Sequence, residues 1–322
     1  MNYDNDVTII ICTKNRVDSL ALILDYHRSC DFQGFIIVAD GSDEQKAVAG
    51  HFSSTRMLQL DCRGLNIEES YLNAVREAKT KYVAYCGDDD FLLRSGLQQC
   101  VRFMSEHPDY AGCTAVSGYL NLSQRGVAFD QVLPYRTDEY SDERASHRLS
   151  KMLFSHSAPW FLIRTELIEK SLSASASFGI PRAREKYLLF STLCQGKVKR
   201  LLNCVYVIRG VHSDSFCYPD DPVDSDPEVR RVVLKTLENH SIELTSADEL
   251  VELHCKNNYK GQPLPILDRS QSARVAGFRH HKILLRIWDL ISIIRIKLLL
   301  LRHRETKSIR KYHRLFCDQS VF

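Results

Sequence analysis

The sequence contains no pair of cysteines in a CxxC arrangement, although it has eleven cysteines in total. Their scattered spacing and odd number argue against a zinc site and against a disulfide framework. Cys12 and Cys86 lie inside apolar runs, where a free thiol packs as a small hydrophobic side chain. The pattern favours a protein of a reducing compartment, and we expect a cytoplasmic location.

Two nucleotide-binding motifs are also missing. No GxGxxG follows the first strand-like run, which disfavours a dinucleotide-dependent dehydrogenase, and the absence of GxxxxGK[ST] excludes the P-loop class.

The first six residues carry no basic stretch, so we expect no signal peptide. The apolar segment from Ile283 to Leu301 contains four charged residues, which makes it a poor bilayer span.

The chain does have the composition of a globular protein, with an uneven distribution of charge. It has 322 residues, 44% hydrophobic and 26% charged, enough for a large core in two or more lobes. The net charge is only +3, yet residues 274–322 carry twelve Lys and Arg against three acidic residues. The sequence therefore predicts an acidic body followed by a basic tail.

Strand-like runs alternate with helical patterns up to residue 90. The strand-like runs are 7–12, 35–39, 57–60 and 82–86, and the helical patterns are 18–30 and 68–80. Alternating strands and helices usually form parallel strands joined by crossover helices. The sequence therefore predicts an α/β fold, a sheet with helices on its faces.

Polar residues follow three of these strands. Thr13 to Arg16 follow the first, Asp40 to Ser42 the second, and Asp88 to Asp90 the fourth. Ligands of parallel sheets bind at the carboxyl ends of the strands, so we expect these residues to line one crevice. Three adjacent carboxylates repel one another unless a cation or ligand offsets their charge, and such clusters suit Mg²⁺ or Mn²⁺. The alternative is a solvated turn after a strand.

The segments 8–16, 37–42 and 82–90 together resemble glycosyltransferase family 2. The resemblance is good over roughly residues 6 to 115 and thinner up to about residue 216. It implies the GT-A fold, a Rossmann-like mixed sheet flanked by helices, and a nucleotide-diphosphate sugar donor, with a UDP-sugar expected. It also implies a divalent metal, Mn²⁺ or Mg²⁺, that stabilises the departing nucleoside diphosphate.

The resemblance assigns roles to individual side chains. The residues expected to bind the nucleotide sugar are Thr13, Asn15, Arg16, Asp40, Asp88 and Trp160, and those expected at the metal are Asp88, Asp89, Asp90 and His212. Two readings of the triplet stay open: Asp88 and Asp90 form the metal-binding pair, or Asp89 is the main ligand. Asp40 also suits a simple turn, Trp160 also suits the core, and His212 also suits a bystander in a polar loop.

Inverting members of the family place a carboxylate, often in a Glu-Asp pair, at the start of a helix in the acceptor half. Glu185 matches the first acid of that pair, whereas Lys186 stands in place of the second. Such a carboxylate takes the proton from the acceptor hydroxyl as that oxygen attacks the anomeric carbon, and a helix N-terminus keeps it ionised. The alternative for Glu185 is a salt bridge to Arg182 or Arg184.

We expect three parts in the chain. Residues 1–115 form the nucleotide-sugar-binding half of the GT-A domain, 116–222 the acceptor-binding half, and 223–322 a helical C-terminal region. Asp226 and Pro227 suit the N-cap and first position of a helix.

The basic amphipathic pattern at 282–314 favours an anionic surface at the inner face of the cytoplasmic membrane. The alternative is a helix packed on the body or on a partner subunit in a homo-oligomer. The tail lacks interleaved aromatics, so we expect no nucleic-acid partner.

The predicted function is metal-dependent, inverting transfer of a sugar to a hydroxyl of a glycan or lipid-linked glycan, as in bacterial surface polysaccharides. A nucleotidyltransferase on a similar sheet is one rival, but it would need a Gly-rich basic loop, and residues 13–16 contain no glycine. A catalytically inactive GT-A-like binding or scaffold protein is the other rival. Lys186 favours it, and the intact acid triplet argues against it.

Overall fold

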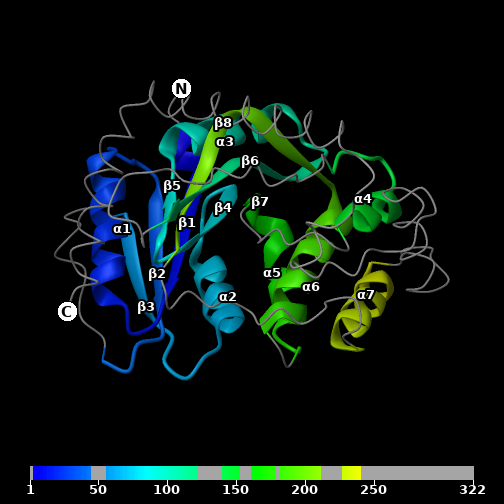
Figure 1. Cartoon of the computed structure of the whole chain (residues 1–322), viewed down its shortest axis with the longest axis horizontal. Helices are drawn as coiled ribbons and strands as arrows, with labels where there is room; N and C mark the ends of the chain where they lie inside the picture. Colours follow the sequence, from blue (N-terminus) through cyan, green and yellow to red (C-terminus); the bar gives the residue numbers. More distant parts are fainter. Residues whose placement is uncertain are drawn as a thin grey trace, which may run out of the picture.

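A single mixed sheet runs through the described part of the chain, with eight strands in the order β3-β2-β1-β4-β7-β6-β8-β5. The computed structural model (Figure 1) describes residues 3–44, 56–121, 140–152, 161–178, 181–211 and 227–240. The strands are β1 (Val7–Thr13), β2 (Phe35–Asp40), β3 (Met57–Asp61), β4 (Tyr82–Gly87), β5 (Asp90–Leu92), β6 (Tyr110–Asn121), β7 (Leu162–Arg164) and β8 (Lys197–Val211). This arrangement confirms the predicted α/β class.

The first four strands are parallel and form one half of the sheet. β1 pairs with β2 on one side and β4 on the other, and β2 pairs with β3. The register sets Thr13 opposite Asp40 and Cys12 opposite both Ala39 and Gly87. The carboxyl ends of these strands therefore lie side by side, as the sequence predicted.

The other strands make the sheet mixed. β7 lies between β4 and β6 and is antiparallel to both, while the long strands β6 and β8 run parallel. β5 pairs with β8 in the antiparallel direction and sets Asp90 opposite Arg209. The expected division between residues 115 and 116 falls inside β6, so the sheet continues across it.

The helices cover both faces of the sheet. They are a short 3₁₀ turn η1 (Tyr3–Asp6), α1 (Val17–Ser29), α2 (Ile67–Glu77), α3 (Arg94–Glu106), α4 (Ala145–Met152), α5 (Thr165–Ser175), α6 (Pro181–Gln195) and α7 (Pro227–Asn239). α1 and α3 cover one face, α2, α5 and α6 pack over the other, and α4 and α7 pack against α6 (Figure 1).

Alternation along β1 divides the core into two clusters. Ile9 and Ile11 face α1 and α3, while Ile10 and Cys12 face α2. Successive side chains of a strand point to opposite faces, and a strand covered on both faces is therefore apolar throughout. Every residue of β1 is buried, which explains the unbroken apolar run in the sequence.

Several helix ends follow from local sequence chemistry. The side chain of Asn66 accepts a hydrogen bond from the Glu69 N–H, and the Glu69 carboxylate accepts from the Asn66 N–H, which forms a capping box at the start of α2. α7 begins at Pro227, as the sequence predicted, because proline is favoured at the first helical position.

The short strand β5 and the helix α4 were not predicted. β5 has only three residues, too few for a periodic signal, and it forms by pairing with the distant strand β8. α4 lies just after a polar, turn-rich stretch that gave little helical pattern. β8 is a single continuous strand of 15 residues, Lys197–Val211.

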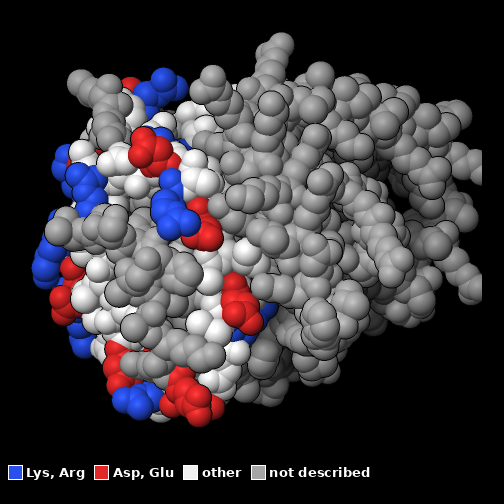
Figure 2. All heavy atoms as spheres, turned by 90° about the vertical axis from the view of Figure 1, so that its left-hand side faces the viewer, with Lys and Arg blue, Asp and Glu red and all other residues white. Residues whose placement is uncertain are grey.

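The surface of the described residues mixes charges of both signs. On the face shown in Figure 2, acidic and basic side chains are interspersed. Among the helices that the structure describes, none has the length and apolar content needed to cross a bilayer. The expected basic tail at 282–314 lies outside the described residues.

Candidate active site

The loop after β1 makes direct contact with the acid triplet after β4. Thr13 Oγ1 donates a hydrogen bond of 2.7 Å to Asp88 Oδ2. Arg16 donates from Nη1 to Asp88 Oδ1 at 2.6 Å and from Nη2 to Asp89 Oδ2 at 3.2 Å. The polar residues that follow β1 and β4 are therefore joined by hydrogen bonds to charged carboxylates.

Asn15 joins the same loop to the residues after β2. Its φ of 56° is in the left-handed region, which asparagine tolerates better than most residues. Its backbone N–H donates to Ser42 Oγ at 2.8 Å, and its side chain exchanges hydrogen bonds with Asp43. The turn thereby ties the first and second strand ends together.

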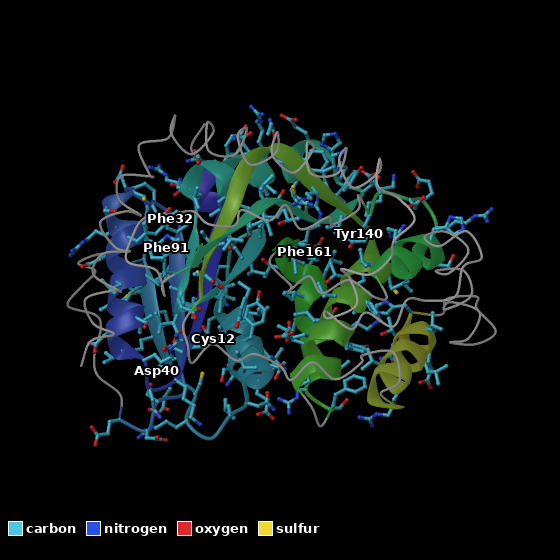
Figure 3. All side chains as sticks on the ribbon, in the orientation of Figure 1. Cys12, Phe32, Asp40, Phe91, Tyr140 and Phe161 are labelled. Carbon is cyan, nitrogen blue, oxygen red and sulfur yellow. The ribbon has the colours of Figure 1, made fainter. Side chains whose placement is uncertain are left out.

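Asp40 is buried at the carboxyl end of β2, and its carboxylate is held from two sides. Oδ1 accepts from the Ser42 N–H at 2.9 Å, and Oδ2 accepts from Gln59 Nε2 on β3 at 3.0 Å. Figure 3 shows Asp40 and Cys12 at the same end of the sheet. These two hydrogen bonds give the carboxylate a fixed orientation.

Burial and neighbouring charge compete at Asp88. The net effect raises the pKa of the Asp88 carboxyl from 3.8 to about 6: burial, the largest cause, raises it, the Arg16 guanidinium lowers it, and the Asp89 carboxylate raises it. The hydrogen bond from Thr13 favours the ionised form and lowers the pKa. Because burial outweighs the pairing, a further cation at this place would stabilise the ionised form.

Gly87 leaves room for two carboxylate oxygens of the triplet. A Cβ at this position would lie 2.9 Å from Asp90 Oδ2 and 3.0 Å from Asp89 Oδ1. The described residues contain no group of three His, Cys, Asp or Glu side chains arranged to hold a metal. Mg²⁺ is commonly held by one or two carboxylates together with substrate phosphates, so the pair Asp89 and Asp90 fits such a cation by donor chemistry.

Glu185 lies on the same face of the sheet as Tyr85, a residue of β4 three positions before Asp88. Burial raises the pKa of Tyr85 well above its usual value, and the charges of Cys12, Glu185, Asp90 and Asp88 raise it further. The helix carrying Glu185, α6, begins at Pro181, so Glu185 stands in its second turn instead of at its start. The helix dipole acts mainly within the first turn, and its effect on Glu185 is therefore weaker than expected.

A buried ion pair links the helices α2 and α6. Arg184 Nη1 donates to Glu68 Oε2 at 2.8 Å, and Arg184 Nε donates to the carbonyl of Phe178 at 2.7 Å. The side chains of Arg184 and Glu68 are only 14% and 7% exposed. From the sequence, a salt bridge of Glu185 to Arg182 or Arg184 is only the alternative to the base role, and the contact of Arg184 with Glu68 is not predicted, because 116 residues separate the pair.

The structure brings most of the expected site residues together at the carboxyl ends of the parallel strands. Thr13, Asn15, Arg16, Asp40, Asp88 and Asp89 are joined by the hydrogen bonds above, and Asp90 begins β5 beside them. The expected sugar platform Trp160 and the expected metal ligand His212 lie outside the described residues. Sequence reasoning missed Gln59, whose signal is a polar residue inside the apolar run of β3.

Comparison with known proteins supports this architecture. The family model for glycosyl transferase family 2 matches residues 8–172. The crystal structure of fragment 1–349 of S. aureus TarS in complex with UDP-GlcNAc matches with a TM-score of 0.56, and its complex with UDP with 0.52. In both, the identity is 16% and the match covers 96% of this chain and 89% of the fragment.

The longer TarS structure matches with a TM-score of 0.50 and covers 83% of this chain but only 46% of the TarS chain. This chain therefore spans about half of that TarS chain. None of the curated proteins compared with the sequence matches it. At 16% identity the likeness to TarS shows the fold alone, the GT-A fold. Because the family model covers just over half of the sequence, this chain belongs to glycosyl transferase family 2.

Proposed function

We propose that this family 2 glycosyltransferase transfers a sugar from a UDP-sugar to a hydroxyl of a glycan or lipid-linked glycan, with inversion at the anomeric carbon. The observation that carries the proposal is that the polar residues after β1, β2 and β4 are hydrogen-bonded to one another at the carboxyl ends of these parallel strands. The TarS structures with UDP and UDP-GlcNAc support the choice of uridine on the same fold.

The donor-binding role falls to the residues after β1 and β2. Asp40, held by Ser42 and Gln59, presents a fixed acceptor for a ring N–H of the base or a ribose hydroxyl. Asn15 and Thr13 fix the loop on which Arg16 stands. Arg16 supplies the positive charge that a diphosphate requires.

We place a divalent cation, Mn²⁺ or Mg²⁺, at Asp89 and Asp90, with Asp88, held by the Thr13 hydroxyl, beside them. When bound, the cation supplies Lewis-acid stabilisation of the negative charge on the departing nucleoside diphosphate. The side chains of Asp88 and Asp89 are 7% and 17% exposed, so the latter is the more accessible to a cation shared with phosphate oxygens. Of the two open readings of the triplet, the geometry therefore supports Asp89 as the main ligand.

Glu185 is the proposed general base. It accepts the proton of the acceptor hydroxyl while the acceptor oxygen forms a bond to the anomeric carbon. The bond from that carbon to the diphosphate oxygen breaks, and the electron pair leaves with the nucleoside diphosphate. A single displacement of this kind inverts the anomeric configuration. The proximity of the Glu185 charge to Tyr85, on the strand that leads into the triplet, supports this role.

The proposed acceptor, a glycan or lipid-linked glycan, follows from the family resemblance. We also propose that residues 282–314 make a peripheral contact with an anionic membrane surface. Co-sedimentation of the full chain with anionic vesicles, but not with neutral ones, is the expected result. A full chain that sediments with neither would remove the membrane contact from the proposal.

Titration calorimetry of nucleoside diphosphates, with and without Mn²⁺, tests the donor. We expect UDP to bind more tightly than GDP or ADP and to gain affinity with Mn²⁺. Asp40→Asn should weaken UDP binding by about tenfold or more, since a hydrogen bond to a charged group is lost. Asp25→Asn, which changes a partly exposed carboxylate on α1 that pairs with Arg28, is the matched control and should bind as the wild type does. A wild-type chain that binds no nucleoside diphosphate contradicts sugar transfer.

Turnover of the donor tests the base. Glu185→Gln should lower kcat by about a hundredfold or more and leave UDP affinity unchanged, because only proton transfer is removed. Glu169→Gln, an exposed carboxylate of α5 paired with Arg76, is the control and should keep wild-type kcat. Wild-type turnover in Glu185→Gln would eliminate Glu185 as the base and leave the donor site untouched.

A further inference from the structure

Arg16 spans two carboxylates of the acid triplet. Its Nη1 lies 2.6 Å from Asp88 Oδ1, and its Nη2 lies 3.2 Å from Asp89 Oδ2. The Arg16 side chain is 36% exposed, whereas both acids are mostly shielded from solvent. The guanidinium thus reaches from the solvent-facing edge onto two acids that need a counter-charge.

The backbone around Arg16 is fixed, so any movement lies in its side chain. The preceding residue, Asn15, is hydrogen-bonded to Ser42 and Asp43. The Arg16 carbonyl accepts a hydrogen bond from the Leu20 N–H at 3.0 Å in the first turn of α1. A long side chain on an anchored backbone can exchange one anionic partner for another without rearranging the loop.

A guanidinium and a divalent cation are alternatives at the same carboxylate oxygens. Both are positively charged, and both would lie within a few ångströms of each other if the two acids held them together. Like charges in a partly buried place repel strongly. Arginine also binds phosphate through two parallel N–H groups, and a diphosphate carries more charge than either carboxylate alone.

We propose that Arg16 is the resident counter-ion of Asp88 and Asp89 in the donor-free protein and that a nucleoside diphosphate releases it. The diphosphate draws the guanidinium onto its own oxygens, and the freed Asp89 carboxylate then accepts the divalent cation together with Asp90. The inference rests on the proposed function, because its ligand is the diphosphate of the donor. Metal and nucleotide must then raise each other's affinity by the same factor.

Titration calorimetry of Mn²⁺, with Mn²⁺ electron paramagnetic resonance as a second readout, tests the inference without any turnover. In the wild type, saturating UDP should raise Mn²⁺ affinity by about tenfold or more. Arg16→Gln should bind Mn²⁺ about tenfold more tightly than the wild type when UDP is absent, because the competing charge is gone. The further gain on adding UDP should be several-fold smaller than in the wild type, because only the phosphate oxygens shared with the cation then couple the two ligands.

Two variants locate the effect. Arg28→Gln removes a guanidinium of α1 that pairs with Asp25 at 2.6 Å, and it should behave as the wild type does. Arg16→Gln combined with Asp89→Asn should lose the gained Mn²⁺ affinity, which places the ion at the triplet. If Arg16→Gln fails to fold by circular dichroism, Arg16→Lys replaces it, and a smaller gain is expected because lysine cannot bridge two carboxylates with a rigid fork.

The inference is wrong if Arg16→Gln binds Mn²⁺ with wild-type affinity in the absence of UDP. If Arg16→Lys has to be used instead, an unchanged Mn²⁺ affinity in that variant would likewise overturn it. A wild type whose Mn²⁺ affinity is the same with and without UDP would also overturn it. These results leave sugar transfer from a UDP-sugar standing, since UDP is still bound, but the last of them would remove the expected gain in UDP affinity with Mn²⁺. Failure of the wild type to bind any nucleoside diphosphate, with or without Mn²⁺, is a separate result that removes the proposed function itself.

Discussion

His27 is a buried imidazole in α1 that plays no part in the candidate active site. Its ring packs edge-on against Tyr26, with centroids 5.2 Å apart, and lies tilted against Phe32, with centroids 5.8 Å apart. Burial lowers the pKa of His27 from 6.5 to about 3. The neutral ring is therefore part of the core between α1 and the loop that leads into β2.

The lowered pKa predicts a pH-dependent component of stability. Between pH 6.5 and about 3 the unfolded chain binds a proton at His27 and the folded chain does not. This contribution is therefore complete above pH 6.5 and is lost as the pH falls, by at most about 1.4 kcal/mol per pH unit. Urea unfolding at pH 7.5 and pH 5 should show a smaller loss for His27→Leu than for the wild type. Equal losses would show that the ring is protonated at little cost in the folded state.

The buried pair Glu68–Arg184 links the helices α2 and α6. Each partner is mostly shielded from solvent, so removal of one leaves the other poorly compensated. Because Glu185 follows Arg184 directly, the pair also holds the proposed base against the donor half of the sheet. A second pair, Arg76–Glu169 at 2.9 Å, joins α2 to α5, but both of its side chains are about half exposed.

Double-mutant cycles should separate the two pairs. Glu68→Gln or Arg184→Met alone should lower the free energy of unfolding by roughly 3 kcal/mol, and the double variant should lose clearly less than the sum. The cycle of Arg76→Met and Glu169→Gln should give a coupling energy below about 1 kcal/mol, as exposed pairs do. Similar coupling energies in the two cycles, measured by urea unfolding, would contradict the assignment.

At the scale of the whole molecule, the proposed donor and acceptor halves share one sheet. β7 pairs with both β4 and β6, and β8 pairs with both β6 and β5. The donor half therefore has strands whose only described partners come from residues beyond 121. The two halves are expected to unfold together, since neither keeps its hydrogen-bonded strand edges without the other.

A fragment of residues 1–115 tests this expectation. It retains β1 to β4 but loses β7 beside β4, and its β5 and truncated β6 lose their described partners. Thermal unfolding followed by circular dichroism should show no cooperative transition for the fragment, whereas the full chain should show one. A fragment that melts cooperatively at the full chain's temperature would establish the donor half as an independent folding unit.

Local chemistry in the sequence determined the parallel half of the sheet. The apolar runs of β1, β2 and β4 are long and buried on both faces, and the polar residues that end them are unmistakable in the sequence. Asp226 and Pro227 likewise indicated where α7 begins. These signals are local, because they depend on periodicity and on residues with a strong backbone preference.

Only the tertiary structure decided which of these side chains touch one another. The bonds of Arg16 to Asp88 and Asp89, of Gln59 to Asp40, and of Arg184 to Glu68 each join distant segments of the chain. The strand β5 exists because β8 runs beside it. A sequence shows the charge that each side chain carries, but the free energy of a charge depends on its burial and on its neighbours, which the fold supplies.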